Sequence, residues 1–480
     1  MNALWRTLRE PEYLIRILPE GTMTTETVNG LLQLKLAKPP SRDAWQRFAQ
    51  YARRVRVPDC PLSVSIAAAL AYPQNARSAP YWGTVMTHYP GAQFLPNMHT
   101  LISHWEVRFD HYNFLIRPPL RHLRLLALHE DAIGPLADAL PNCASTLETI
   151  YIDITSTIET IYLDMTLASH TRRSRFAQRL SRGLMKLRKL VSQDIQIPCY
   201  QAIPHLASLP TLRELRLVDI SDTGATSLPF PALEKLSITI NNATERFLIP
   251  FLGKVGAPVL QELKIHYDVR LDYRTDLRPA ASQIHAILRD LSRFTHLHAF
   301  TLDGFNLAPP PENEHILGAL MLAPLLTLRK LETLEMRGVS AMLSSGDAAT
   351  MARSWPRLQC LRISDKVYFP DHLERRTLLQ TDDLLPFARF CPDLHTLGLP
   401  LEIEETSVRV GAPGLPPPSK LNKLSVSGVA EELSEDVLDL FTRVFPSVSV
   451  KVPSGYEGAA SELCARGDYA DDETDSEEDY

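Results

Sequence analysis

The sequence lacks the features that mark an exported, membrane-spanning or disulfide-linked protein. Its six cysteines lie far apart and include no C-x-x-C pair, which argues against both a disulfide framework and a zinc site. Such cysteines are typical of reduced, mostly buried thiols, and we expect a cytoplasmic or nuclear protein. No uninterrupted apolar run reaches membrane length, and the first residues carry charges where a secretory peptide would be apolar. We therefore expect no membrane association.

An excess of positive charge is lacking too. The formal net charge is -6, but seven acidic residues lie within the last ten positions, so the rest of the chain is near neutral. Nucleic acid is therefore not an expected partner. A run of like charges repels itself, and residues 453–480 are predicted to form a disordered acidic tail.

Motifs of enzymes and cofactor sites are also missing. The chain has only 20 glycines, and it contains no G-x-S-x-G, H-E-x-x-H, P-loop or G-x-G-x-x-G phrase. His296 and His298 lie close together without cysteine or acid at ligand spacing, which favours solvated histidines over a metal site. We predict a non-enzymatic protein without cofactor or metal, although an active site assembled from distant residues would escape a motif search.

What the sequence does contain is a recurring phrase, Leu-x-x-Leu-x-Leu, in which other apolar residues substitute. In seven copies a proline stands two residues before the first apolar position. Proline fixes φ and disfavours helix in the residue before it, so P-x-L should end a helix and begin a strand. Alternation within the phrase sends both final apolar side chains to one face. The copies begin at Met98, Leu120, Leu147, Leu187, Leu212, Leu233, Leu260, Leu297, Leu331, Leu358, Leu394 and Leu421.

Helix-like stretches such as residues 283–291 separate the strands, so the pattern predicts repeated strand, turn and helix. We therefore predict an α/β fold: an irregular leucine-rich-repeat solenoid, or horseshoe, over residues 96–452 with a parallel β-sheet on its concave face. Pro446 before Val448 suggests a last, degenerate unit. The alternative is an armadillo-like helical protein whose leucine phrases arose by chance.

Residues 1–95 lack the phrase and are predicted to form a helical N-terminal cap. Apolar spacing predicts short helices around Leu4, Trp5 and Leu8 and again around Leu14, Ile15 and Leu18. A further helix is expected after Ser41, which is a plausible N-cap, and residues 55–57 could be a first edge strand.

Two adjacent eleven-residue segments, Ser145–Thr155 and Ser156–Thr166, match at eight positions. Eleven residues are too few for a full repeat, so the pair indicates a tandem duplication. One copy should form the strand and the other a loop or an extension of it, and the sequence does not decide which.

The residue between the last two apolar positions of each phrase should point away from the core, onto the concave face. Arg124, Arg216, Lys264 and Arg362 are predicted to make the middle of this face cationic, which would suit an acidic patch on a protein partner. The competing interpretation is that water-facing strand surfaces are polar whatever they do. The predicted partner-binding residues are Arg124, Tyr151, Arg216, Lys264, Glu335 and Arg362.

The opening ALWRTLREPEYLIRILP, the phrase SRDAWQRFAQYARRVRVP and the irregular repeats together resemble the F-box and leucine-rich-repeat proteins of mushroom-forming fungi. The resemblance spans residue 3 to about residue 450 and implies the substrate-recognition part of a ubiquitin-ligase receptor, in which an F-box binds a Skp-type adaptor. Only Met1 and Asn2 precede the matching phrase, so we expect an F-box that was either missed upstream or lost. The residues that match are Leu4, Trp5, Leu18, Pro19, Trp45, Phe48, Tyr51, Ala52, Arg54, Val55 and Arg56.

A second functional class remains open, a leucine-rich-repeat regulator of a small GTPase. Repeat proteins that activate the Ran GTPase also end in an acidic tail, but their repeats are more regular and usually carry asparagine after the strand. At the equivalent positions here only Asn241 is an asparagine. We rank this alternative below the protein-binding scaffold.

Overall fold

The computed structural model describes residues 7–8, 17–20, 22–28, 31–36, 38, 40–54, 57–60, 97–104, 116–126, 133–152, 177–195, 199–218, 220, 224–240, 245–267, 281–303, 316–337, 340–363, 379–403, 406, 415–426, 428–429 and 433–451. The chain divides into two compact units of similar size. Unit 1 consists of residues 1–233 and 254–257, and unit 2 of residues 234–253 and 258–480. The acidic tail predicted for residues 453–480 lies outside the described residues.

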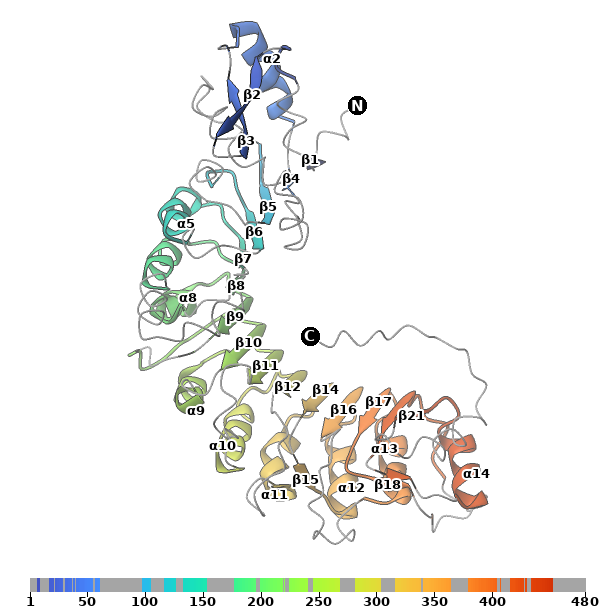
Figure 1. The fold of residues 1–480 in the computed structure, drawn as a ribbon. Coiled ribbons are helices and arrows are strands. Elements are labelled where there is room, and N and C mark those ends of the chain that lie inside the picture. The colour runs from blue at the N-terminus through green and yellow to red at the C-terminus, as the bar shows by residue number, and fades with distance from the viewer. Residues whose placement is uncertain are drawn as a thin grey trace. The chain divides into compact units, whose positions relative to one another are not determined.

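In unit 1 the main sheet is a ladder of parallel strands that follow one another in chain order. Short helical segments, including α5 (Ile133–Ala139), η5 (Tyr200–Ala202) and α8 (Ile203–Ser208), lie on one side of the ladder (Figure 1). The strands are β1 (Thr7–Leu8), β4 (Val57–Cys60), β5 (Thr100–His104), β6 (His122–Leu126), β7 (Thr149–Ile152), β8 (Ser192–Ile195) and β9 (Glu214–Val218).

Unit 2 repeats this plan, and its strands are again parallel and in chain order. The strands are β10 (Lys235–Ile240), β11 (Glu262–Tyr267), β12 (Ala299–Asp303), β14 (Thr333–Met336), β16 (Cys360–Ile363), β17 (Thr396–Gly398), β19 (Lys423–Ser425) and β21 (Ser449–Lys451). The helices include α9 (Glu245–Lys254), α10 (Ala281–Leu291), α11 (Ala319–Leu322), η7 (Ala323–Thr327), α12 (Ser345–Ser354), η9 (Thr381–Leu384), α13 (Leu385–Phe390) and α14 (Glu435–Val444).

Two short parallel ladders join successive return segments of unit 2, away from the main sheet. Strand β13 (Ile316–Gly318) pairs with β15 (Ser340–Met342), and β18 (Glu402–Ile403) pairs with β20 (Gly428–Val429). Successive repeats are therefore hydrogen-bonded to each other at more than one place.

The leucine phrases form the core, as predicted. All twelve residues at which the phrases were predicted to begin are at most 3% exposed. Along the strands buried and water-facing residues alternate, as in β10 and β12. Each unit is therefore a stack of leucine-rich repeats around a parallel sheet, and the fold class predicted from the sequence is confirmed.

The proline of the P-x-L phrase occupies the second position of a four-residue turn. Leu358 donates its amide to the carbonyl of Trp355, which places Pro356 directly after the acceptor. The same bond joins Leu394 to Cys391 around Pro392, and Val448 to Phe445 around Pro446. Proline is favoured at this turn position because its fixed φ suits it. The degenerate unit expected at Pro446 is real, since β21 follows it.

A second regular feature ties each repeat to the next. One carbonyl accepts two consecutive amides of the following repeat: Glu332 receives those of Gln359 and Cys360 at 2.7 and 3.0 Å. We call this arrangement the shared-carbonyl turn. The acceptors are His99, Arg121, Glu148 and Val191 in unit 1, and Glu234, Gln261, His298, Glu332, Gln359 and His395 in unit 2.

The phrase predicted to begin at Leu187 is out of register. Strand β8 pairs with β7 so that Gln193 lies opposite Ile150, which makes Leu190 the residue equivalent to Leu147. The sequence pattern favoured a start at Leu187 over one at Leu190, because Gln193 occupies a position that holds an aliphatic residue in the neighbouring strands. Gln193 is 2% exposed, and its side-chain oxygen has no hydrogen-bond partner in the part of the chain that is described.

The N-terminal region is richer in strands than the apolar spacing suggested. Helix α2 (Arg42–Ala52) begins after Ser41, whose hydroxyl accepts the amide of Ala44 at 3.2 Å, as predicted. An antiparallel hairpin, β2 (Met23–Val28) and β3 (Leu31–Leu36), was not anticipated.

The helix expected around Leu8 is wrong, because Thr7–Leu8 is strand β1, paired with β4. β1, rather than residues 55–57, is the outermost strand of that ladder, and β4 begins only at Val57. Leu4, Trp5, Leu14 and Ile15 lie outside the described residues.

Of the two duplicated segments, the first provides the strand, since Thr149–Ile152 is β7. It directly follows the turn after η4 (Leu140–Cys143), where Leu147 donates to the carbonyl of Cys143 at 2.9 Å. Residues 153–166, which include the whole second copy, lie outside the described residues.

Replacing Gln193 with leucine should stabilise the protein. The substitution removes a side-chain oxygen that is buried away from water and has no hydrogen-bond partner among the described residues. Its removal is expected to raise the free energy of unfolding by about 1–2 kcal/mol. The midpoint of urea-induced unfolding measures this. Leu215, opposite Gln193 on β9, provides the matched control: Leu215→Gln should lower the free energy of unfolding by roughly 2–4 kcal/mol. A lower midpoint for Gln193→Leu would contradict the register.

Candidate binding face of the sheet

The side of the sheet that faces away from the core carries one residue per strand in direct register. In unit 1, β6 places Arg124 opposite Tyr151 of β7, and β8 places Asp194 opposite Arg216 of β9. Tyr151 and Asp194 are also direct neighbours. Four of these side chains therefore form one row across adjacent strands, with spacing set by the backbone ladder of about 4.8 Å per strand.

Neighbouring side chains in this row contact each other in pairs. The Arg124 guanidinium lies 5.1 Å from the centre of the Tyr151 ring, which is a cation–π distance. Arg216 forms an ion pair with Asp194, with 3.4 Å between Nη1 and Oδ2. Arg216 is thus partly neutralised by Asp194, while Arg124 contacts an aromatic ring and has no ion-pair partner among the described residues.

The row in unit 2 passes through Lys264, Thr301, Glu335 and Arg362, each opposite the next. Lys264 bonds the carboxylate of Glu262 on its own strand at 2.7 Å. Glu335 bonds Arg337 at 2.9 Å and also accepts from the thiol of Cys360 at 3.4 Å. These charges are again satisfied mainly by near neighbours.

Arg362 differs from the other cations of the row. It makes no hydrogen bond or ion pair with the described part of the chain, and its Nε is buried. Beside it lies Gly398, the outward residue of β17, where an added Cβ would stand 3.5 Å from Cγ of Arg362. That separation is an ordinary van der Waals contact, so the Arg362 side chain lies close to the neighbouring strand β17.

All six predicted binding residues thus face outward, three in the row of each unit. The middle of this face is less cationic than predicted, because Arg216 and Lys264 have carboxylate partners. Asp194 was missed because the register of β8 was placed three residues too early. Whether these residues bind a partner stays a prediction.

The described residues contain neither a metal-binding cluster nor a membrane-spanning helix. No group of three histidine, cysteine or acidic side chains there could hold a metal ion. No helix among them is both long and apolar enough to span a membrane. His298, at the foot of β12, is half-buried and uses its main chain in the shared-carbonyl turn.

The four cysteine thiols that the structure describes in full are protected rather than activated. Cys143, Cys199 and Cys391 are buried, and Cys360 is half-buried. Burial raises the pKa of each of these thiols to about 12, and the nearby Glu335 carboxylate adds to the effect at Cys360. A nucleophilic cysteine needs the opposite shift, because the thiolate is the reactive species.

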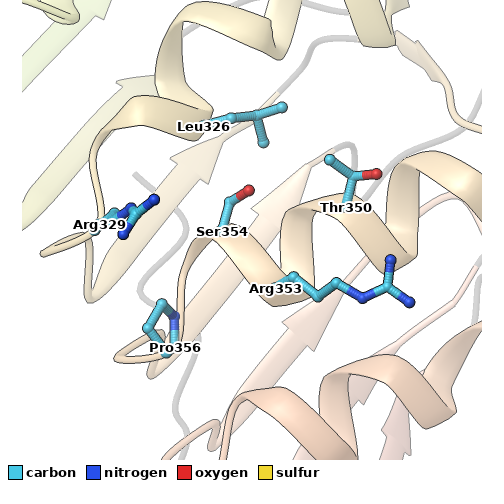
Figure 2. A pocket seen from close by; sticks show the side chains of 6 residues that line it. All are labelled: Leu326, Arg329, Thr350, Arg353, Ser354 and Pro356. Carbon is cyan, nitrogen blue, oxygen red and sulfur yellow. The ribbon is translucent and has the colours of Figure 1, made fainter.

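A separate hollow of about 340 Å³ opens on the helical side of unit 2. It is lined by residues of η7, of α12 and of the turns that follow them: Leu326, Arg329, Thr350, Arg353, Ser354 and Pro356. Figure 2 shows Ser354 between Arg329 and Arg353. This hollow was not anticipated from the sequence, because its residues come from two successive repeats and form no motif.

Comparisons with known proteins identify no family. No family model matches the chain, and no curated protein matches it. Among solved structures, an internalin from Listeria monocytogenes is similar over 78% of this chain and 87% of that chain, with 12% identity and a TM-score of 0.35. A likeness of that degree carries no functional argument, and the assignment of the fold rests on the strand ladder and buried leucines.

Cys360 should react slowly with alkylating reagents in spite of its partial exposure. A pKa near 12 in place of the usual 8.5 lowers the thiolate fraction at pH 8 by roughly 10³-fold. Iodoacetamide labelling followed by peptide mapping would measure this, with the urea-unfolded chain as control. Labelling of native Cys360 at the rate of the unfolded chain would show that the thiol is not shielded as described.

Proposed function

We propose that this chain is a non-enzymatic scaffold that binds another protein across the outward face of its sheet. The observation that carries the proposal is that long side chains lie in register on the strand ladder of each unit, above all Arg362, which has no hydrogen-bond or ion-pair partner among the described residues. Because the strand already orders the backbone that carries these side chains, binding does not have to order it, which favours affinity. Arginine and tyrosine are also the residues that most often dominate protein interfaces.

The partner surface that best fits either row is mixed in charge rather than uniformly acidic. A carboxylate would meet Arg362, and the Arg124–Tyr151 pair offers an aromatic ring together with a cation. Asp194 and Glu335 would repel acidic groups placed beside them. The alternation of charge favours a specific partner over any polyanion.

The finer proposal is that the chain is the target-holding part of an F-box-type ubiquitin-ligase receptor. It rests on the resemblance of the N-terminal phrases, in which Trp45 and Phe48 lie buried in α2. In such a receptor a Skp-type adaptor binds the F-box and the repeats bind the target.

A regulator of a small GTPase is the second candidate. It is favoured only by the repeats and by the acidic C-terminal sequence. Measuring GTP hydrolysis by a Ran-type GTPase with and without the full chain tests it directly. An acceleration of the hydrolysis rate would replace the leading proposal.

Charge reversal on the sheet face should remove the partner while leaving the fold intact. We expect Arg124→Glu with Arg362→Glu to reduce recovery of specific partners at least about tenfold, since each lost charged contact contributes roughly 1.5–3 kcal/mol. Affinity capture with the tagged full chain and quantitative mass spectrometry measures the recovery.

The matched control reverses two exposed arginines away from the row, Arg182→Glu with Arg246→Glu, which changes the charge equally. Proteins lost from the face variant but kept by the control support the face. Equal recovery of partners with the wild-type protein, the face variant and the control variant would refute binding by this face. Adaptor and cullin subunits are expected only in captures with a protein that carries an F-box upstream of the matching phrase, and their absence from those captures would contradict only the ubiquitin-ligase proposal.

A further inference from the structure

The outward face of the sheet in unit 2 changes its charge along the stack. Both signs are mixed on the earlier strands, where Glu262 of β11, Asp303 of β12 and Glu335 of β14 lie among lysine and arginine residues. The last four strands, all of whose residues are described, carry no acidic residue on this face. We call their outward residues the cationic end of the face: Cys360 and Arg362 of β16, Thr396 and Gly398 of β17, Lys423 and Ser425 of β19, and Ser449 and Lys451 of β21.

The cations of the cationic end lie within a small area. Strands β16, β17, β19 and β21 are consecutive neighbours in the sheet, and Figure 1 shows β16, β17 and β21 in one row. The register places Gly398 and Ser425 between Arg362 and Lys451, so no long side chain separates these two cations. Three strand spacings of about 4.8 Å put them about 14 Å apart.

The described residues do not neutralise this end of the face. The carboxylate of Glu335, which is the neighbour of Arg362 in the row, bonds Arg337 at 2.9 Å, and Arg362 itself has no ion-pair partner among the described residues. Lys423 and Lys451 are exposed. Cations on neighbouring strands repel each other, so a bound polyanion would stabilise this arrangement.

The chain itself contains a polyanion close by. Seven acidic residues and no lysine or arginine lie in residues 471–479, which we call the acidic segment. It follows Lys451, the last residue of β21, by about twenty residues. A stretch of that length spans at most about 65 Å, whereas the cationic end is only about 14 Å across. The acidic segment can therefore reach every cation of the cationic end.

We propose that the acidic segment binds the cationic end of its own chain and competes there with the protein partner. A tether of this length raises the local concentration of the segment to roughly the millimolar range, so weak ionic contacts are enough to occupy the face. A partner that binds only through negative charge is then excluded, and one with additional contacts displaces the segment. The competition rests on the proposed function of the face, but the contact itself can be measured without any partner.

The contact is tested with full chains and a fluorescently labelled peptide of residues 468–480, by fluorescence anisotropy at low salt. We expect the peptide to bind a neutralised chain at least about fivefold more tightly than the wild-type chain, whose own segment competes with it. Equal affinity for the two chains, or no binding to either, would overturn the proposal. The neutralised chain carries Asp471→Asn, Asp472→Asn, Glu473→Gln, Asp475→Asn, Glu477→Gln, Glu478→Gln and Asp479→Asn.

The position of the contact is tested in the neutralised chain. Arg362→Gln with Lys451→Gln should weaken peptide binding about fivefold or more, since two ionic contacts are lost. Arg246→Gln with Arg443→Gln is the matched control, because these exposed arginines of α9 and α14 lie off the sheet and the change in charge is equal. The control should keep the affinity within about twofold, and an equal loss would show that the attraction is not specific to the cationic end.

Binding of the acidic segment to a second copy of the chain is the competing arrangement. Light scattering after size-exclusion chromatography, over a range of protein concentrations, distinguishes the two. Intrachain binding predicts the same molar mass for the wild-type and neutralised chains at each concentration. Association of the wild-type chain that the neutralised chain does not show would place the segment on another copy and overturn the intrachain proposal.

Affinity capture with the neutralised chain tests the competition. Recovery of the partners that depend on the sheet face should rise severalfold over that of the wild-type chain. If recovery is unchanged while Arg124→Glu with Arg362→Glu still removes these partners, the proposed function stands and the competition is refuted. If the peptide binds the cationic end but no partner depends on the face, the contact stands and the proposed function fails.

Discussion

The shared-carbonyl turn is the constraint on which the rest of each unit depends. A carbonyl such as that of Gln359 accepts the amides of both His395 and Thr396, at 2.8 and 3.1 Å. These bonds fix where the next strand begins, and the parallel ladder then fixes which residues face the core. The rows of outward side chains inherit their alignment from this turn, because a strand that slipped by one residue would turn its leucines to the water.

Much of this arrangement could be predicted from the sequence, since the proline turn and the aliphatic alternation are local signals. The prediction of strand positions failed where contacts between distant parts of the chain, rather than local sequence, determine the structure. Gln193 occupies a core position because its neighbours in the ladder leave it no alternative, and no propensity would have shown this. Strand β1 likewise depends on pairing with a segment about fifty residues away.

The candidate sites show the same division. Outward positions follow from alternation, so all six predicted residues were correctly placed on one face. Their electrostatic state could not be predicted, because Asp194 and Glu262 become partners of cations only once the register is known. The hollow beside α12 is harder still to foresee, since Arg329 and Ser354 come together only through the stacking of successive repeats.

The turn fixes only a few residues of each repeat, and the length of chain between successive turns varies. Starts of successive repeats are 21 residues apart between Leu212 and Leu233 but 37 apart between Leu260 and Leu297, and the strands that follow still pair with their neighbours. Such a scaffold tolerates gene-level insertions, as the tandem copy at Ser156–Thr166 illustrates. Evolution can therefore remodel the outer loops of this chain in steps of any length while its sheet stays unchanged.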